Sequence, residues 1–519
     1  MRKSSYKYLG AAAALMLLAG GFIYGHKEDF GLGRNMELAV NMMRELSLNY
    51  VDSVDTDKLM EGAAAGMVRN LDPYTEFIPE KEVSEFEMLT TGKYGGIGSL
   101  IRQKGDYVII AQPYEGSPAD KAGLKIGDRI LSIGNDSAKG FTTEQVSARL
   151  KGEPNTAVQL TIERLDGTKH ELQIMLERIP IPAISYSGWV ADGVGYIRHD
   201  DFTDSCAAEL RAAIEKLKKE GELHSLILDY RGNGGGFMQE AVKIVSLFTP
   251  RGTEVVRTKG RNEEKSYKTT TDPVYPDLRL VLLVNGGSAS ASEIVAGSLQ
   301  DLDRAVLVGQ RTLGKGLVQT TLPLGYNAML KLTTAKYYIP SGRCIQAIDY
   351  SERQKGHELK KDTAGGIMPD IEIKDSSKVD ICYSLYIDNY FFDYATRYHR
   401  LHDSIAAPDV FELTEKDIDD FCAYLEERKF SYETETSKFF ADMLRMAENE
   451  DIDSTTFAQL KAFEPMLKPD FRAAIERNID EVKTLLGSEI VLRYYYQKGQ
   501  AAYQLRFDKE LKRALQELK

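Results

Sequence analysis

The chain has 519 residues, of which 43% are hydrophobic and 28% are charged, and its formal net charge is −12. This length corresponds to roughly three or four domains, and the composition is that of a globular protein, which excludes wholesale disorder. The acidic balance provides no electrostatic surface for wrapping nucleic acid, so we expect no nucleic-acid partner.

The N-terminal segment, residues 1–29, has the features of an export signal. Arg2, Lys3 and Lys7 precede an uncharged, mostly apolar run over residues 9–24. This run is shorter than the roughly 20 residues of a membrane span but long for the apolar part of a signal peptide. We interpret it as an uncleaved signal anchor in the inner membrane, with a cleaved signal peptide as the alternative. Both interpretations place the remaining chain outside the cytoplasm, in the periplasm, because the positive charges precede the apolar run.

Residues 30–91 are predicted to be a helical N-terminal region. Apolar residues from Met36 to Leu48 recur at spacings near 3.6, which is typical of an amphipathic helix. A second helix is predicted over residues 59–71. It ends before Pro73, since the residue preceding a proline resists the helical conformation.

Residues 92–180 have a different character, with dense glycines and short β-branched stretches. Strands are predicted at 107–111, 129–133 and 158–162 and a helix at 143–150, so we expect a small β-rich module. Its loop Gly95, Gly96, Ile97, Gly98 precedes a strand. Such a loop can hold a terminal carboxylate on its amides while the peptide adds as an extra strand. An ordinary glycine-rich hairpin loop is the alternative.

Residues 181–375 alternate predicted strands and helices. Such alternation implies an α/β layer fold, and the continuous apolar strands imply a sheet that is covered on both faces. The predicted strands are 194–197, 225–229, 280–284 and 305–308, and the predicted helices are 205–220, 238–248 and 291–302.

Two loops of this region contain residues suited to acyl transfer. The glycine loop RGNGGG (231–236) follows a strand, and its backbone N–H groups can form an oxyanion hole, although a tight turn would use the same residues. The segment NGGSASASEI (285–294) lies where a strand ends and a helix begins, where open α/β sheets place their active sites. A serine there is a candidate nucleophile, with a helix N-cap as the alternative. The G-x-S-x-G elbow is absent, and His199 is the best candidate for a histidine base.

The loop GQRTLGKG (309–316) follows the last predicted strand. It matches G-x-x-x-x-G-K, but Gly316 replaces the Ser or Thr that binds magnesium in a P-loop, so nucleotide binding is disfavoured. Lys315 has another use: if desolvated, its neutral amine can serve as a general base. A solvated loop lysine is the alternative.

No metal site is expected. The four cysteines form no C-x-x-C pair, and there is no H-E-x-x-H motif. His399 and His402 fit no ligand pattern and are interpreted as surface groups on a helix.

Residues 376–519 are predicted to be helical and are highly charged. The segment TEKD (414–417) has the form of a capping box at a helix start, and few helix breakers follow Phe471. A packed helical bundle is the simplest interpretation, with dimerisation, gating of access or adaptor binding as alternatives.

Taken in order, these motifs resemble those of the carboxyl-terminal processing (tail-specific) proteases, over about residues 37–375. The matching segments are NYVD (49–52) and LDPYT (71–75) of the family's N-terminal region, residues 94–130 of its inserted PDZ domain, the glycine motif RGNGGG (231–236), and the catalytic pair SASASE (288–293) and TLGKGLVQ (312–319).

The resemblance implies an α+β multidomain protein. Its parts would be the helical N-terminal region, an inserted β-rich PDZ domain at 92–180, a crotonase-like α/β protease core at 181–375 and a helical C-terminal domain at 376–519. Its activity would be that of an exported serine endopeptidase of the cell envelope, with a Ser-Lys mechanism and no metal or cofactor.

The resemblance also assigns the site residues. The nucleophile would be Ser290 and the general base Lys315. Gln319 matches a residue that positions the lysine, Glu293 and Thr312 match supporting positions, the amides of Ala291 and of Gly235 or Gly236 would form the oxyanion hole, and Gly95, Gly96, Ile97 and Gly98 would bind the substrate's C-terminus. Lys151 stands where some members have an arginine that senses bound peptide.

The implied partners are protein substrates with free C-termini and the membrane at the N-terminal segment, together with an adaptor or a second copy at the C-terminal helices. Two other function classes remain open. One is a binding protein that holds C-termini without cleaving them, and the other is a Ser-His hydrolase that uses His199.

Overall fold

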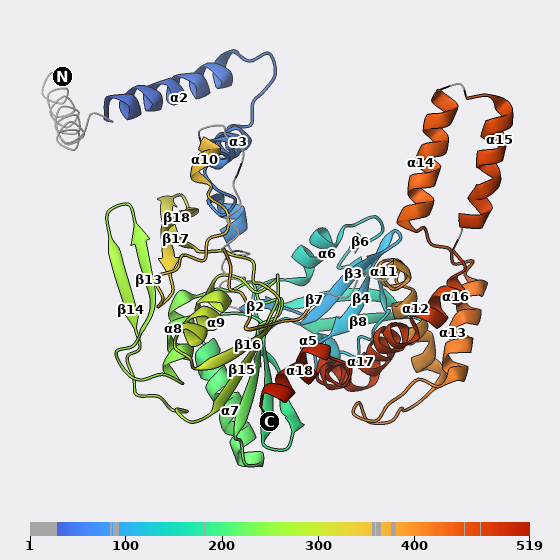
Figure 1. Cartoon of the computed structure of the whole chain (residues 1–519). Helices are drawn as coiled ribbons and strands as arrows, with labels where there is room; N and C mark the ends of the chain where they lie inside the picture. Colours follow the sequence, from blue (N-terminus) through green and yellow to red (C-terminus); the bar gives the residue numbers. More distant parts are fainter. Residues whose placement is uncertain are drawn as a thin grey trace, which may run out of the picture. The chain divides into compact units, whose positions relative to one another are not determined.

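The computed structural model describes residues 29–83, 86, 93–180, 182–354, 359, 365–374, 380–450, 452–467 and 469–518 (Figure 1). The apolar run over residues 9–24, interpreted above as a signal anchor, lies outside these residues. Among the helices that the structure describes, none combines the length and apolar character needed to cross a bilayer.

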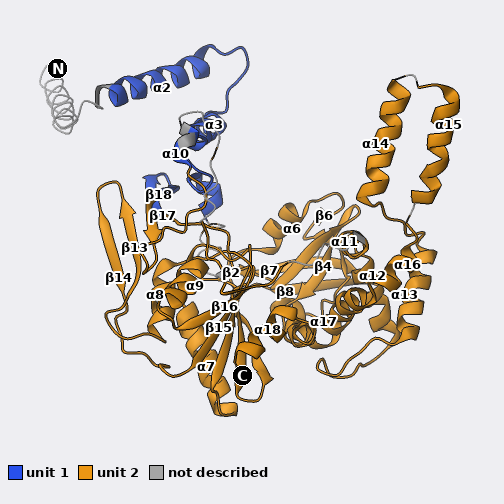
Figure 2. Cartoon of the chain, in the orientation of Figure 1, with its two compact units in different colours: residues 1–83, 319–333, 350–358 blue, residues 84–318, 334–349, 359–519 orange. Residues whose placement is uncertain are grey.

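The chain divides into two compact units (Figure 2). The smaller unit consists of residues 1–83, 319–333 and 350–358, and the larger unit contains the rest. In the smaller unit, the two predicted helices are present as α2 (Asp29–Asn49) and α3 (Thr56–Val68). Strand β1 (Glu76–Ile78) follows them and pairs antiparallel with residues 329–331 of β18 (Ala328–Tyr338).

The larger unit is built on a six-stranded sheet in the order β10-β11-β12-β15-β16-β19. Its neighbouring strands run parallel except for β10 and β11. The strands are β10 (Ile184–Ala191), β11 (Val194–His199), β12 (Ser225–Asp229), β15 (Arg279–Val284), β16 (Ala305–Gly309) and β19 (Ile371–Glu372), and the helices that alternate with them are α7 (Cys206–Glu220), α8 (Met238–Ser246) and α9 (Ala291–Asp301). The strands and helices predicted within residues 181–375 are therefore confirmed.

Both faces of this sheet are covered, as its apolar strands predict. On one face, Leu226 and Leu282 pack in the core with α7, α8 and α9. On the other, Ile227 and Val281 lie in one buried cluster with Leu511 and Ala514 of α18 (Lys509–Glu517). Helix α18 contacts β15 and β16 of this sheet (Figure 1). The sequence predicts helices after residue 376 but does not indicate that one of them covers the core sheet.

The β-rich module predicted at 92–180 is also present in the larger unit. A sheet in the order β3-β4-β5-β7-β8, with β6 paired to β5, encloses a core that includes Val108, Ile130 and Leu160. The elements are β2 (Lys93–Gly96), β3 (Ser99–Lys104), β4 (Tyr107–Pro113), α5 (Pro118–Lys121), β5 (Arg129–Ile133), β6 (Asp136–Ser137), α6 (Thr143–Leu150), β7 (Ala157–Glu163), β8 (Lys169–Met175) and β9 (Glu177–Pro180), where β2 pairs with β9. Strand β3 lies at the sheet edge.

Strands β13 (Glu254–Gly260), β14 (Glu264–Lys268), β17 (Leu317–Gly325) and β18 form three further pairings among the described residues. In the larger unit, β13 pairs with β14 and with residues 335–338 of β18. Strand β17 pairs with β18 through a turn at Tyr326 and Asn327, both at positive φ.

The C-terminal residues form a helical bundle around Phe391, Phe421 and Ile490. The capping box predicted at the start of α13 is confirmed, because the Asp417 carboxylate accepts from the Thr414 amide at 2.8 Å and the Thr414 hydroxyl from the Asp417 amide. The helices of the C-terminal residues are α11 (Asp380–Ile387), α12 (Tyr390–Leu401), α13 (Glu415–Glu427), α14 (Glu435–Asn449), α15 (Ser454–Phe463), the 3-10 helix η1 (Glu464–Leu467), α16 (Phe471–Arg477), α17 (Ile479–Leu505) and α18. Helices α11, α12, α13, α16 and α17 supply the buried core of the bundle.

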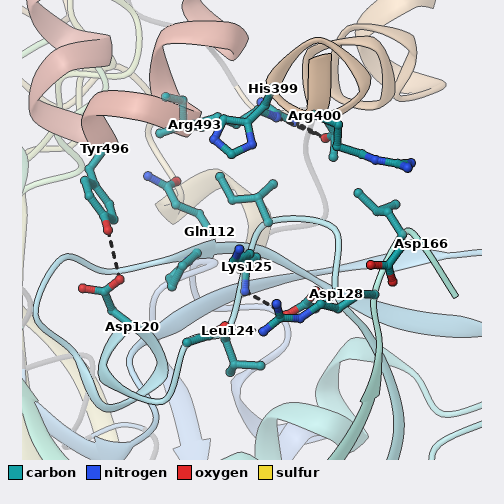
Figure 3. A pocket seen from close by; sticks show the side chains of 17 residues that line it. Gln112, Asp120, Leu124, Lys125, Asp128, Asp166, His399, Arg400, Arg493 and Tyr496 are labelled. Carbon is teal, nitrogen blue, oxygen red and sulfur yellow. Dashed lines mark hydrogen bonds between the residues drawn. The ribbon is translucent and has the colours of Figure 1, made fainter. Parts of the chain in front are cut away.

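The bundle contacts the β-rich module directly. Lys104 forms an ion pair with Asp393 at 2.5 Å, and the Tyr496 hydroxyl donates to Asp120 at 3.0 Å. Asp120 and Tyr496 also line a cavity of about 500 Å³, into which His399 of α12 faces (Figure 3). His399 is exposed on α12, which agrees with its interpretation as a surface group on a helix, and the partial burial of its ring together with the charges of Arg493 and Lys125 lowers its pKa.

Candidate active site

Ser290 lies in a strained backbone conformation at the end of the loop that follows β15. Its φ is 57° and its ψ is −114°, and it directly precedes α9. Ser290 therefore does occupy the N-cap position, but N-cap residues normally have extended backbones. A non-glycine residue at positive φ is costly and is often found at functional sites. The amide of Ala291, in the first turn of α9, has no partner within the helix.

The two serines that flank Ser290 have structural roles. The hydroxyl of Ser288, which is fully buried, donates to the Tyr230 carbonyl at 2.8 Å and accepts from the Asn285 amide. The hydroxyl of Ser292, also fully buried, donates to the Asn233 carbonyl at 2.9 Å. Ser290 lies at the bend between them and is half-buried. Ser288 and Ser292 therefore hold the loop, whereas Ser290 is partly accessible.

The glycine loop packs directly against this bend. Gly235 has a φ of 97°, and a Cβ atom there would lie 2.6 Å from the Cβ of Ser290 and 2.8 Å from the amide nitrogen of Ala291. The Gly235 amide already donates to the Asn233 side chain at 2.9 Å. Because Gly235 and Phe237 use their backbone groups to pair with Phe202, the amide of Gly236 between them points to the opposite side.

Two asparagines that the sequence analysis did not single out join the two loops. The side-chain oxygen of Asn285 accepts from the amides of Gly232 and Gly287, each at 2.9 Å. The Asn233 carbonyl accepts from the Ala289 amide, and its side-chain amide donates to the His199 carbonyl at 2.8 Å. Their signal in the sequence is an asparagine next to glycine after a strand, which is typical of turns in general and therefore not specific.

The carboxylate of Glu293 connects the serine bend to the lysine loop. One of its oxygens accepts from the Ser290 amide and the Lys315 amide, each at 2.8 Å. The other accepts from the Thr312 hydroxyl at 2.5 Å and the Gly314 amide at 2.7 Å. Glu293 is fully buried, and this burial raises its pKa while the hydrogen bonds from Thr312 and the backbone oppose the rise.

The lysine loop is held from both sides of Lys315. Besides the amide bond to Glu293, the Lys315 carbonyl accepts from the Tyr337 hydroxyl, and the Gly316 amide donates to the Gln346 side chain at 2.7 Å. The Ser290 and Lys315 amides share one acceptor oxygen, so the two backbones lie within two hydrogen-bond lengths of each other. Lys315 itself is half-buried. Ser290 and Lys315, which are 25 positions apart in the sequence, are therefore neighbours in the structure.

Gln319 belongs to the smaller unit, where it is linked to the LDPYT segment. Its side-chain amide donates to the Thr333 hydroxyl at 3.3 Å, and that hydroxyl donates to Asp72 at 3.2 Å. Asp72 also accepts from the amide and hydroxyl of Thr75. Two segments that the sequence analysis matched separately, 71–75 and Gln319, are therefore parts of one hydrogen-bond network.

The predicted peptide-binding loop runs from β2 to the start of β3. The Ile97 carbonyl accepts from the Ala119 amide at 2.8 Å, and Gly98 has a φ of 72°. Gly95 lies against Gly152, and Gly96 pairs with Lys151. The loop is thus fixed by its own module next to the edge strand β3.

His199 lies in an aromatic cluster rather than among groups that would orient a base. Its ring is fully buried, with centroids 4.6 Å from Phe202 and 5.1 Å from Tyr230. Burial lowers its pKa to about 4. This environment favours a structural histidine over the Ser-His alternative. In the part of the chain that the structure describes, no three His, Cys, Asp or Glu side chains gather in a way that could hold a metal ion.

Comparison with known proteins gives three family matches within this chain. Residues 193–373 match peptidase family S41, residues 109–164 match a PDZ domain, and residues 381–518 match the C-terminal helical domain of probable PDZ-proteases.

Among individual relatives, a carboxy-terminal-processing protease from Bartonella bacilliformis is 35% identical over 335 residues, covering 62% of this chain and 76% of the relative. A probable CtpA-like serine protease from Staphylococcus aureus is 33% identical over 331 residues, covering 62% and 66%. Among solved structures, the photosystem II D1 C-terminal processing protease is 26% identical with a TM-score of 0.37, covering 64% of this chain and 86% of that one. The PDZ domain of a carboxy-terminal protease from Vibrio cholerae, in complex with a peptide, is 27% identical with a TM-score of 0.17, covering 17% and 99%.

Proposed function

Because the chain belongs to the carboxy-terminal-processing proteases of peptidase family S41, and is thus a serine-type peptidase with a PDZ domain, we propose that it cleaves its substrates by a Ser-Lys mechanism. Ser290 is the nucleophile and Lys315 the general base. The observation that carries this proposal is the single Glu293 oxygen that accepts from both the Ser290 and the Lys315 amides.

The mechanism follows from these positions. The neutral amine of Lys315 takes the proton of the Ser290 hydroxyl, and Ser290 attacks the scissile carbonyl. The amides of Ala291 and Gly236 donate to the resulting oxyanion, since the Gly235 amide is engaged by Asn233. The leaving amine departs with a proton from Lys315, and water then hydrolyses the acyl-enzyme. Glu293 and Thr312 support the two loops, and the resemblance assigns Gln319 to positioning the lysine. No step requires a metal or cofactor.

The PDZ domain captures the substrate's free C-terminus. The carboxylate binds the amides of residues 95–98 while the peptide adds to the edge strand β3. With capture and cleavage at separate sites, we expect the enzyme to select substrates by their tails without requiring a strict sequence at the cleavage site.

We further propose the boundaries 30–91, 92–180, 181–375 and 376–519 for the four parts of the chain. Residues 1–29 direct export to the cell envelope and are either retained as an anchor or cleaved.

The test uses the purified full chain and an unfolded protein that ends in small apolar residues, beside a copy with an amidated C-terminus. We expect cleavage of the free-tailed copy, its loss in Ser290→Ala, and a decrease of about 10²–10⁴-fold in Lys315→Ala. Ser341→Ala and Lys336→Ala, both exposed, serve as matched controls. Cleavage that survives Ser290→Ala would refute the mechanism, and tail binding by the wild type without any cleavage would favour the binding-protein alternative.

A further inference from the structure

Arg231, the first residue of the glycine loop, is held by three carboxylates. Its guanidinium donates to Asp229 at 2.5 Å, to Asp508 at 2.6 Å, and to Glu510. Asp229 ends strand β12, whereas Asp508 and Glu510 come from the start of α18. All four side chains are largely buried, with exposed fractions of 18% for Arg231, 2% for Asp229, 14% for Asp508 and 16% for Glu510.

Two of the three acidic partners, Asp508 and Asp229, are held by further hydrogen bonds. One oxygen of Asp508 caps α18 by accepting from the Leu511 amide at 2.8 Å, which leaves the other for Arg231. Asp229 accepts from the Tyr196 hydroxyl at 2.5 Å and from the Arg231 amide at 2.9 Å. Planar guanidinium groups that meet several carboxylates have little orientational freedom, so the position of Arg231 is well determined.

The position of Arg231 continues into the proposed oxyanion hole. The next residue, Gly232, donates its amide to Asn285 of the serine loop, and Asn233 accepts from Ala289 in that loop. Gly235 then contacts Ser290. A displacement of Arg231 would therefore move the Gly236 amide, which is proposed to donate a hydrogen bond to the oxyanion.

Docking α18 does not by itself require these charges at this place. Leu511 and Ala514 already bury the helix against the core sheet. An ion pair that served only to attach α18 to the sheet could involve any charged residue along the edge of their contact. At an exposed position such an ion pair would add little stability. Here two carboxylates of one helix start converge on the one arginine that begins the glycine loop.

We propose that Asp508 and Glu510 are positioning residues for catalysis: by fixing Arg231, the C-terminal helix α18 holds the glycine loop in the conformation that stabilises the oxyanion. This inference rests on the proposed function. It assigns the end of the C-terminal helical domain a direct part in the protease core. Substrate capture by the PDZ domain does not depend on it.

The test compares Asp508→Asn, Glu510→Gln and the double variant with the wild type on the free-tailed substrate. We expect kcat to fall about tenfold in each single variant and further in the double variant, with KM within about twofold. A complete loss of one oxyanion donor would cost about 10²–10³. Glu517→Gln is the matched control, because Glu517 pairs with Arg513 on the same helix, away from the loop, and it should leave kcat unchanged.

Two readouts separate positioning from folding. A peptide aldehyde mimics the tetrahedral intermediate, so its affinity should fall in step with kcat, whereas the affinity for an unreactive C-terminal peptide should not change. In an Arg231→Ala background, the acidic substitutions should have no further effect on kcat. The inference would be overturned if the double variant had the wild-type kcat, or if the acidic substitutions still lowered kcat in the Arg231→Ala background. In either case, cleavage that depends on Ser290 would still support the proposed function. Absence of Ser290-dependent cleavage in the wild type would overturn both.

Discussion

The carboxylate of Glu293, in the first turn of α9, accepts a hydrogen bond from the amide of Lys315, in the loop that follows β16, at 2.8 Å. The same oxygen also accepts from Ser290, so one buried side chain sets the spacing between the proposed nucleophile and base.

Replacing Glu293 by glutamine should abolish most activity. Each carboxylate oxygen of Glu293 accepts hydrogen bonds from two donors. In a glutamine one of these oxygens is replaced by an NH₂ group, which cannot accept, so two donors would lose their acceptor. We expect cleavage to fall at least about 10²-fold and the free energy of unfolding to fall by about 1–3 kcal/mol. Steady-state kinetics and urea unfolding measure both. Glu215→Gln, whose carboxylate accepts from Tyr275 away from the site, is the control. Wild-type kinetics in Glu293→Gln would contradict the bridging role.

Gly235→Ala and Gly234→Ala form a matched pair in the glycine loop. An added methyl at Gly235 meets Ser290 at 2.6 Å in a backbone with a φ of 97°, whereas at Gly234 no atom lies within 4 Å. We expect Gly235→Ala to lose about 10²-fold or more in kcat through displacement of the oxyanion amides, and Gly234→Ala to retain activity near the wild-type level. Equal losses in both variants would show that the loop's general flexibility, not the contact with Ser290, matters.

His199 makes stability depend on pH. Its folded pKa of about 4 lies below the unfolded value of about 6.5, so the unfolded state binds protons more readily and stability falls as the pH drops through this window. The loss should reach about 2 kcal/mol at pH 5. We expect His199→Phe to flatten the pH dependence of the unfolding free energy while retaining cleavage at neutral pH. Loss of turnover in a folded His199→Phe variant would instead support the Ser-His alternative.

Gly98→Ala should weaken tail binding. An added Cβ there lies 2.6 Å from the Cβ of Ser117, in a backbone with a φ of 72°. Gly105→Ala, at the turn after β3, has a similar φ of 58° but open space around it, so it controls for backbone strain alone. We expect a higher KM for the free-tailed substrate in Gly98→Ala only, with little change for an amidated tail. An unchanged peptide affinity in calorimetry would place the carboxylate elsewhere.

Much of this protein could be predicted from its residues because the relevant signals are local. Apolar runs bounded by glycines predicted the core strands, and the turn before α9 together with the glycine loop pointed to the catalytic segments. The fold class and the family followed from the order of these motifs. Residue types alone leave the choice among Ser288, Ser290 and Ser292 open, and the family resemblance selects Ser290. The structure adds the physical difference: hydrogen bonds hold the two flanking serines, whereas Ser290 lies at the strained bend.

The sequence by itself determined the succession of strands and helices, the apolar character of both sheet faces and the residue types available for acyl transfer, because periodicity and turn chemistry act over a few neighbours. Only the tertiary structure decided which distant residues meet. Glu293 joins Ser290 to Lys315, and Asp508 reaches Arg231 across 277 positions of the chain. Such contacts depend on how whole elements pack, and a buried carboxylate looks the same in sequence as an exposed one.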